Sequence, residues 1–176
     1  MSPLPSLRKP EVLAPAGKEA VFHAVLEAGA DAVYLAGKRF NMRRHRADFN
    51  FGDADLKRLC GIAHAGGRKV YVTVNALVGP AELADLADYL RTLADAGADA
   101  VIVQDYAVVK TVRELGLPLP LHASTMMNVN SVEAARFLKA HGFTRVVTSR
   151  DITLEALRRL GEGAEIETEY FIHGDM

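Results

Sequence analysis

Amphipathic segments alternate with short apolar runs along the chain, and this order is repeated six times. Each amphipathic segment has apolar residues at i, i+3 and i+4 and ends near a glycine, which predicts a helix. A run rich in Val, Ile, Leu and Ala then follows, and one more such run precedes the first helix. These runs predict seven strands, at residues 11–15, 31–35, 69–75, 99–104, 119–122, 144–148 and 165–172.

The helices are predicted at residues 18–28, 53–65, 81–96, 106–115, 131–141 and 153–160. Asp53, Ser131 and Thr153 each stand where a side-chain oxygen can cap the first turn. Glycine tolerates the left-handed conformation that follows a helix end, because it has no Cβ. We expect this role for Gly29, Gly66, Gly97, Gly116, Gly142 and Gly161.

Strict alternation of strand and helix predicts parallel strands joined by crossover helices. The fold class is therefore α/β, as an incomplete TIM (β/α)8-type barrel, since the complete barrel has eight strands and typically about 250 residues. We expect residues 1–10, with three prolines, to be a flexible lead-in and residues 11–176 to form the truncated barrel domain. Its first and seventh strands would have open edges, which favour self-association.

Composition narrows the classes of function. The net charge of −1 gives no overall attraction for nucleic acid or anionic membranes. Neither a membrane span nor a secretory signal is visible, so we expect a cytoplasmic protein with no membrane partner. The single cysteine, Cys60, lies on the apolar face of a predicted helix. It excludes internal disulfides and an all-cysteine metal site within this chain, and no other ligand spacing predicts a metal.

The connection at residues 36–52 is much longer than the usual βα loop of about 2–6 residues. In a barrel it would lie at the carboxyl ends of the strands, where active sites are built. Five formal positive charges and a histidine fall within residues 37–46. Arg43 and Arg44 are candidates for binding a small anion or an RNA backbone; a solvated loop paired with nearby carboxylates is the alternative. Because like charges repel, we expect the loop to be poorly ordered or drawn away from the mouth.

Polar residues at or just past the strand ends are the other candidates for substrate binding. For each one alone, capping a turn is the alternative. Ser124 or Thr125 beside His122 could suggest a nucleophile and its base. However, neighbours on a strand point apart and alternate residues lie about 7 Å apart, so we expect no such contact and assign no catalytic residue. The candidates are Asn75, His122, Ser124, Thr125, Asn128, Arg150, Glu169 and His173.

Several segments, taken together and in order, resemble the N-terminal part of the collagenase-like peptidase family U32. They are residues 11–17, 29–35, 69–75, 122–125 with Asn128, 145–147, 149–150 and 169–174. The resemblance implies one of two activities. The family is named after peptidases, while other members are oxygen-independent hydroxylases of tRNA, rRNA or a ubiquinone precursor. Met126 and Met127 depart from the family pattern after the Ser-Thr pair, which leaves the subfamily open.

The hydroxylase relatives imply an iron–sulfur (4Fe-4S) cluster, whose cysteine ligands would follow residue 176. We therefore expect no cofactor within this chain and no activity from this stretch alone. The resemblance further implies a small anionic oxygen donor, such as prephenate, and RNA as partners. The main hypothesis is thus the barrel part of an RNA hydroxylase, or of a hydroxylase of a quinone precursor. A collagenase-like peptidase and a non-catalytic RNA-binding barrel are the alternatives.

Overall fold

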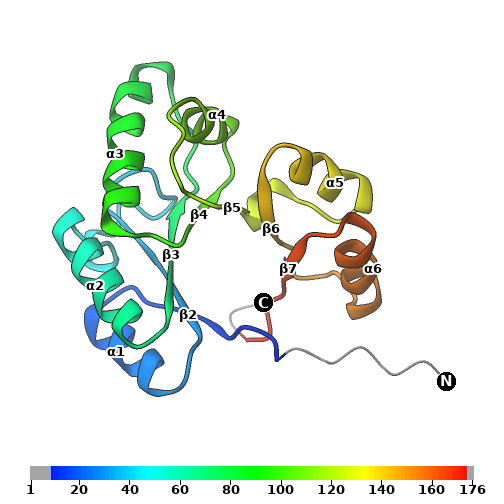
Figure 1. Cartoon of the computed structure of the whole chain (residues 1–176), viewed down its shortest axis with the longest axis horizontal. Coiled ribbons are helices and arrows are strands. Elements are labelled where there is room, and N and C mark those ends of the chain that lie inside the picture. Colours follow the sequence, from blue (N-terminus) through cyan, green and yellow to red (C-terminus); the bar gives the residue numbers. More distant parts are fainter. Residues whose placement is uncertain (1–8, 174–176) are drawn as a thin grey trace.

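Seven parallel strands follow one another in the sheet in the order of the sequence and curve into an open barrel (Figure 1). The computed structural model describes residues 9–173, so most of the predicted lead-in lies outside the described residues. The strands are β1 (Leu13–Pro15), β2 (Ala32–Ala36), β3 (Lys69–Val74), β4 (Ala100–Val103), β5 (Leu121–Ala123), β6 (Phe143–Val147) and β7 (Glu167–Glu169). This architecture confirms the predicted α/β, incomplete TIM-type barrel.

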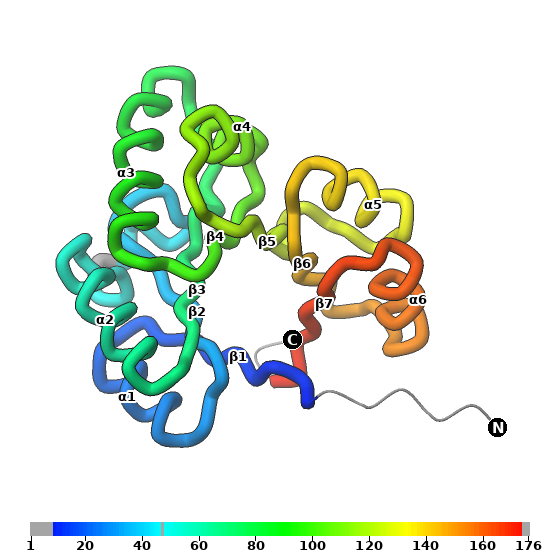
Figure 2. The backbone as a smooth tube through the Cα atoms, in the orientation of Figure 1, coloured from blue at the N-terminus to red at the C-terminus, as the bar shows by residue number. Residues whose placement is uncertain are grey.

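Helices cover the outside of the strands, with α1 to α4 on one side and α5 and α6 on the other (Figure 2). Three short 3-10 turns, η1 (Ala47–Phe49), η2 (Pro80–Glu82) and η3 (Thr125–Met127), lie in the loops. In the part of the chain that the structure describes, no helix is both long and apolar enough to cross a membrane. The helices are α1 (Glu19–Glu27), α2 (Asp53–Ala65), α3 (Leu83–Ala96), α4 (Tyr106–Glu114), α5 (Val132–Ala140) and α6 (Leu154–Ala164).

Two of the three predicted helix caps are confirmed. The Ser131 hydroxyl accepts a hydrogen bond from the Ala134 amide at the start of α5, and the Thr153 hydroxyl accepts one from the Ala156 amide at the start of α6. Asp53 is not the cap of α2, because Gly52 occupies that position and Asp53 is the first helical residue. The carboxylate of Asp53 turns instead to Arg39, in an ion pair of 2.8 Å.

Two predicted helix ends need correction. After α2, Gly67 has the positive φ, of 67°, whereas Gly66 stays at −92°. The sixth helix continues past Gly161 to Ala164, and Glu165 takes the left-handed conformation with φ 50°. Gly161 serves close packing instead, since a Cβ there would lie 3.3 Å from Thr168 Cγ2 on β7. The seventh strand is accordingly three residues long, shorter than the predicted 165–172.

Large apolar side chains fill the space between the outer face of the sheet and the helices. Buried valines of β2, β3 and β4 pack there against leucines of α2 and α3. Cys60 belongs to this layer, and burial raises the pKa of its thiol to about 11, so the thiol stays protonated and inert, as predicted. The inner face of the same sheet carries a smaller apolar cluster, made of Ala32, Tyr71, Ala100 and Ile102.

Two aspartates tie the amino-terminal ends of the strands together. Asp31 accepts a hydrogen bond of 2.9 Å from the Val12 amide, and Asp99 accepts one of 2.8 Å from the Val70 amide. Each stands in the repeated Ala-Gly-Ala-Asp-Ala-Val turn that leads from a helix into a strand. These contacts lie at the bottom of the barrel and explain the repeat as a shared solution for one turn.

Candidate functional site

An arginine lies inside the barrel, among glutamates from both ends of the sheet. Arg145 on β6 keeps only 9% of its side chain exposed. Its guanidinium donates a hydrogen bond of 2.8 Å from Nη1 to Glu11 Oε1 and another of 2.8 Å from Nη2 to Glu167 Oε2. Glu169 Oε2 lies 3.6 Å from Nη1. Since Glu11 precedes β1 while Glu167 and Glu169 form β7, Arg145 links the first and last strands across the interior.

Glu11 is the most highly coordinated carboxylate of this cluster. The Tyr71 hydroxyl donates to it at 2.8 Å, and Lys69 Nζ approaches it to 3.1 Å. Burial acts to raise the pKa of Glu11, but hydrogen bonds from Tyr71, Arg145 and Lys69 lower it below its ordinary value. The Tyr71 ring also lies 5.1 Å from the Arg145 guanidinium. Glu11 is therefore a fixed negative charge that positions Arg145.

His122 projects into the same interior from β5. It pairs in register with Arg145, is only 4% exposed, and meets the ring of Tyr71 edge-on at 4.7 Å. Its buried Nδ1 has no hydrogen-bond partner among the described residues. Burial, and then the positive charge of Arg145, lower the pKa of His122 to about 3. The imidazole is therefore neutral at ordinary pH, with one ring nitrogen available to a ligand.

Glu169 lies at the carboxyl end of β7 and, like His122, is close to Arg145. Burial raises its pKa above the ordinary value, and the nearby Arg145 only partly opposes this. Its buried Oε2 also lacks a hydrogen-bond partner in the described part of the chain. A neutral imidazole and a buried carboxyl group with a raised pKa, each with a polar atom that lacks a hydrogen-bond partner, are typical of a ligand site.

Tyr34 connects this interior to the mouth of the barrel. Burial raises the pKa of its hydroxyl, the negative charge of Glu169 adds to the shift, and the positive charge of Arg43 opposes it. The charges of a buried carboxyl group and of a loop arginine therefore both act on the Tyr34 hydroxyl. The Arg43 guanidinium has no hydrogen bond or ion pair with any residue between 9 and 173. Its charge is therefore uncompensated, and it lies near enough to Tyr34 to act on that hydroxyl.

The long loop at residues 36–52 is held against the strand ends, so the expectation that it is drawn away is wrong. Asn75, which follows β3, accepts a hydrogen bond of 3.2 Å from the Met42 amide. Asn41 is buried and accepts one of 2.8 Å from the Arg43 amide. Asn50 donates to the carbonyls of Arg43 and Arg46, both at 2.9 Å. The asparagines supply the contacts that outweigh the repulsion between the charges.

Most of the positive charges in the loop are neutralised. Arg39 pairs with Asp53 and with Asp85, each at 2.8 Å. Arg44 pairs with Glu82 and Arg46 with Asp48, each at 3.3 Å. The structure therefore separates the two arginines that the sequence grouped, because Arg44 is engaged on the surface and Arg43 is not.

Ser124, Thr125 and Asn128 belong to the turn η3 beyond β5. The Ser124 hydroxyl accepts a hydrogen bond of 3.3 Å from the Met126 amide, and Asn128 ends the turn with φ 52°. Among the described residues neither hydroxyl contacts a histidine, as predicted, and the carboxylate of Glu169 faces Arg145 rather than an imidazole. A peptidase triad is therefore not assembled from these groups.

Arg150 and His173 lie on the surface. Arg150 is placed 5.7 Å from the ring of Phe171, and His173 is exposed. Of the predicted site residues, the structure thus brings His122 and Glu169 into one interior, with Arg43 over it. Sequence reasoning missed five members of the cluster, which are Glu11, Lys69, Tyr71, Arg145 and Glu167.

The family follows from the sequence itself. The profile of Peptidase family U32 matches residues 17–176. This chain belongs to peptidase family U32. Seven strands in sequential order also agree with a solved structure of a U32 peptidase, at a TM-score of 0.75 and 17% identity, covering 95% of this chain and 72% of that one. A lyase or mutase structure from Burkholderia cenocepacia, at a TM-score of 0.61 and 14% identity, covers 97% of this chain and 71% of that one and shares the fold.

The U32 chain has curated relatives whose names refer to RNA hydroxylation. It is 35% identical over 169 residues to tRNA hydroxylation protein P1 of Bacillus subtilis, covering 96% of this chain and 40% of that protein. It is 36% identical over 165 residues to a 23S rRNA 5-hydroxycytidine synthase of Escherichia coli, covering 93% of this chain and 24% of that protein. An uncharacterized protease of Methanocaldococcus jannaschii is 33% identical, covering 93% of this chain and 40% of that protein. The chain thus spans less than half the length of these relatives.

Proposed function

We propose that this U32 chain is the barrel part of an oxygen-independent hydroxylase that modifies RNA and takes its oxygen from a small anionic donor. The observation that carries the proposal is 35–36% identity, over nearly the whole chain, to relatives named for tRNA hydroxylation and for rRNA 5-hydroxycytidine synthesis. Because those relatives are longer, the activity is proposed for the complete enzyme. The same names favour RNA over a quinone precursor as the substrate.

The geometry of the interior supports this proposal. Arg43 is a free cation at the mouth, and it attracts an anion such as the carboxylates of prephenate. Past it lie the Tyr34 hydroxyl, the carboxyl group of Glu169 with its raised pKa, and the neutral ring of His122. Burial disfavours the charged form of Glu169, which lowers its repulsion of a bound carboxylate, and neutral His122 offers a ring nitrogen without adding a charge. Arg145, saturated by glutamates, orients these two groups.

The described residues do not fit an iron–sulfur cluster. Cys60 is the only cysteine of the sequence and is buried behind the sheet with a raised pKa. Residues 9–173 also contain no group of three or more His, Cys, Asp or Glu side chains placed to hold a metal ion. A cluster of the complete enzyme would need ligands other than these, and no step proposed for Arg43, His122 or Glu169 passes through it.

An exchange of barrels tests the proposal. The host is a Bacillus subtilis strain that lacks its tRNA hydroxylation proteins P1 and P2. It expresses a chimaera, which is P1 with its matching segment replaced by this chain. Nucleosides from tRNA are then digested and measured by mass spectrometry. We expect hydroxylated nucleosides to return with the chimaera, and Arg43→Ala in it to reduce them by about tenfold, as for loss of one charge-assisted contact.

Arg46→Ala is the matched control, because Arg46 lies in the same loop but is paired with Asp48. It should leave the hydroxylated nucleosides unchanged. A chimaera that accumulates to the level of the native protein and forms no hydroxylated nucleoside would contradict the proposed function.

A further inference from the structure

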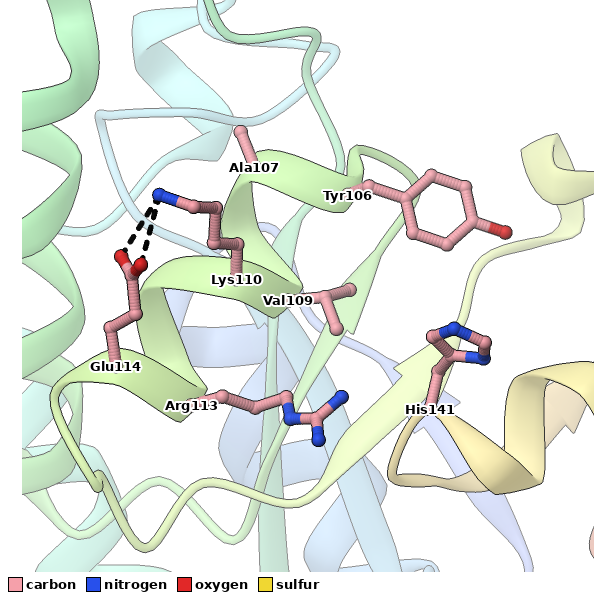
Figure 3. A pocket seen from close by; sticks show the side chains of 7 residues that line it. All are labelled: Tyr106, Ala107, Val109, Lys110, Arg113, Glu114 and His141. Atoms are coloured by element: carbon pink, nitrogen blue, oxygen red, sulfur yellow. Dashed lines mark hydrogen bonds and ion pairs between the residues drawn. The ribbon is translucent and has the colours of Figure 1, made fainter.

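A hollow of about 500 Å³ opens on the outer wall of the barrel, between α4 and α5 (Figure 3). Tyr106 and His141 reach over it from the two helices, Val109 lines its floor, and Arg113 points into it from below. A second hollow of about 460 Å³ shares Arg113 and extends the first toward Leu117 and Leu121 on the barrel's outer surface. We call the two together the α4–α5 groove.

The aromatic ring of Tyr106 lines this groove and is open to solvent, because Tyr106 is 49% exposed. Phe137 on α5 is 52% exposed and lies next to the groove residue His141. The ring of Phe137 lies against that of His141, with 4.1 Å between their centroids. Exposed aromatic and imidazole rings of this kind provide stacking platforms for unpaired bases.

The wall that carries the groove is positive, although the whole chain has a net charge of −1. Residues 106–142 contain two arginines and two lysines against two glutamates, which gives a net charge of +2. Arg113 forms no hydrogen bond or ion pair with the described residues. Arg136 donates only to the carbonyl of Gly163, at 2.9 Å, so its charge is also uncompensated. This excess of positive charge favours an anionic polymer over a purely apolar partner.

The groove begins at the mouth of the barrel. Tyr106 follows Asp105 immediately after the carboxyl end of β4, and the Asp105 carboxylate accepts hydrogen bonds of 2.8 Å from the amides of Val78 and Ala107. These bonds fix the start of α4, and therefore the backbone that carries Tyr106. From there the groove follows α4 down the wall to His141, which comes directly after α5.

We propose that the α4–α5 groove binds the single-stranded RNA next to the nucleotide that enters the mouth. Tyr106 and the Phe137–His141 pair stack bases, and Arg113 contacts a phosphate. This inference rests on the proposed function for its RNA substrate, but it assigns a separate surface to the flanking strand. A polypeptide partner would use the apolar floor and gain little from the unpaired arginines.

Fluorescence anisotropy of a labelled 12-nucleotide oligouridylate, titrated with this chain at several salt concentrations, tests the groove. Tyr106→Ala should weaken binding at least about fivefold, the lower limit for loss of one stacked base. Arg113→Gln should lower the slope of log K against log salt by about 0.7, the value for one phosphate contact on a single strand. Circular dichroism melting curves verify that both variants are folded.

Arg91→Gln is the matched control, since Arg91 is an exposed arginine on α3 that is paired with Asp88. It removes the same charge, and it should leave affinity and slope unchanged. If folded Tyr106→Ala and Arg113→Gln bind the oligouridylate as tightly as the wild type does, the proposal that the groove binds RNA is wrong. It is also wrong if the wild-type chain does not bind the oligouridylate. A change in sedimentation of Arg113→Gln with unchanged RNA affinity would assign the groove to a protein contact instead. The nucleoside assay of the chimaera is independent, so each failure is attributable to its own proposal.

Discussion

The two halves of the barrel interior are built from different chemistry. On β2 to β4 the inward residues Ala32, Tyr71, Ala100 and Ile102 form an apolar cluster. Among the described residues of these strands, only Lys69 and the Tyr71 hydroxyl reach to the polar group at Glu11. On β5 to β7 the corresponding positions carry His122, Arg145, Glu167 and Glu169. TIM barrels usually fill their interior with layers of branched apolar side chains. Here, within residues 9–173, only the β2–β4 half has an apolar inner cluster, whereas the outer face of β2 to β6 is lined by buried apolar side chains.

A buried ion cluster is an expensive replacement for apolar packing. Taking charges out of water costs several kcal/mol each, and the attraction between them often only offsets that cost. The β5–β7 half is therefore poorly explained by stability alone, whereas unpaired polar atoms at His122 and Glu169 are features of a ligand site. The contrast indicates that β2–β4 contribute most of the apolar packing, while β5–β7 supply most of the candidate polar groups and Tyr34 and Tyr71 add to them from β2 and β3.

The largest effect should come from removing the centre of the polar half. Arg145→Met leaves the largely buried Glu169 without its cation and Glu11 with Lys69 alone, and we expect a loss of about 3–5 kcal/mol in the free energy of unfolding. Urea denaturation measures this loss. Arg91→Met, at an exposed ion pair on α3, is the control and should cost less than about 0.5 kcal/mol. An Arg145 variant as stable as that control would mean that the interior charges are solvated.

The polar half should also make stability depend on pH. His122 has a folded pKa of about 3 against 6.5 for the free side chain, so below pH 6.5 the unfolded chain binds the extra proton. This contribution is complete above pH 6.5 and is lost as the pH falls toward 3, at about 1.4 kcal/mol per unit. Glu169, with its raised pKa, acts in the opposite direction just above pH 4.5. The free energy of unfolding in urea is measured against pH for the wild type and for His122→Asn, and the difference between the two profiles isolates the contribution of the histidine. Equal slopes of the two profiles between pH 3 and pH 6.5 would contradict the lowered pKa of His122.

The apolar half should respond to lost volume and hardly to pH. Ile102→Val removes one methylene from the cluster with Tyr71 and Ala100, and we expect a loss of about 0.5–1.5 kcal/mol in unfolding free energy. The same loss should be measured at pH 5 and pH 8. A loss that changes strongly between these two values would show that the halves are coupled rather than separate.

The smallest effect on stability belongs to the loop above the interior. Replacing Arg43 and Arg44 by alanine removes one free cation and one exposed ion pair with Glu82, so unfolding free energy should change by less than about 0.5 kcal/mol. Calorimetric titration with prephenate should nevertheless show about tenfold weaker binding, as expected for a lost charge-assisted contact. Arg46→Ala serves as the control. If the double variant binds prephenate with unchanged affinity, the alternative holds, in which the loop is a solvated surface that binds no anion.

The fold was predictable because its signals are local and repeated. Helical periodicity, cap residues and glycine ends each predict their element without long-range contacts, and the right-handed crossover rule orders the strands. Errors appeared where tertiary packing overrode the local signal. Gly161 marked a helix end in the sequence, yet it lies inside α6 because the helix needs a small residue against Thr168.

The site was predictable only in part, because candidate residues were sought only at or just past the ends of the predicted strands. Glu169 lies at such an end, whereas His122 is the middle residue of β5. Glu11, Tyr71 and Arg145 also lie within or before strands and meet only when the sheet curves. Charged residues inside otherwise apolar strands were the available signal, and Glu167 with Glu169 shows the two-residue spacing of a shared face. The separation of Arg43 from Arg44 was beyond the sequence, since it depends on where Glu82 lies.

Two glycines of α6, Gly161 and Gly163, allow this helix to pack closely against β7 and α5. Gly161 lets the helix approach β7, and a Cβ on Gly163 would come within 2.9 Å of Val132 on α5. Each glycine also costs about 1 kcal/mol of helix propensity, so α6 depends on its docking more than on its own backbone. The last helix–strand unit is therefore a cooperative unit of low intrinsic stability. Its local opening would uncover Glu169, whose side chain is only 18% exposed, while β2–β4 stay folded.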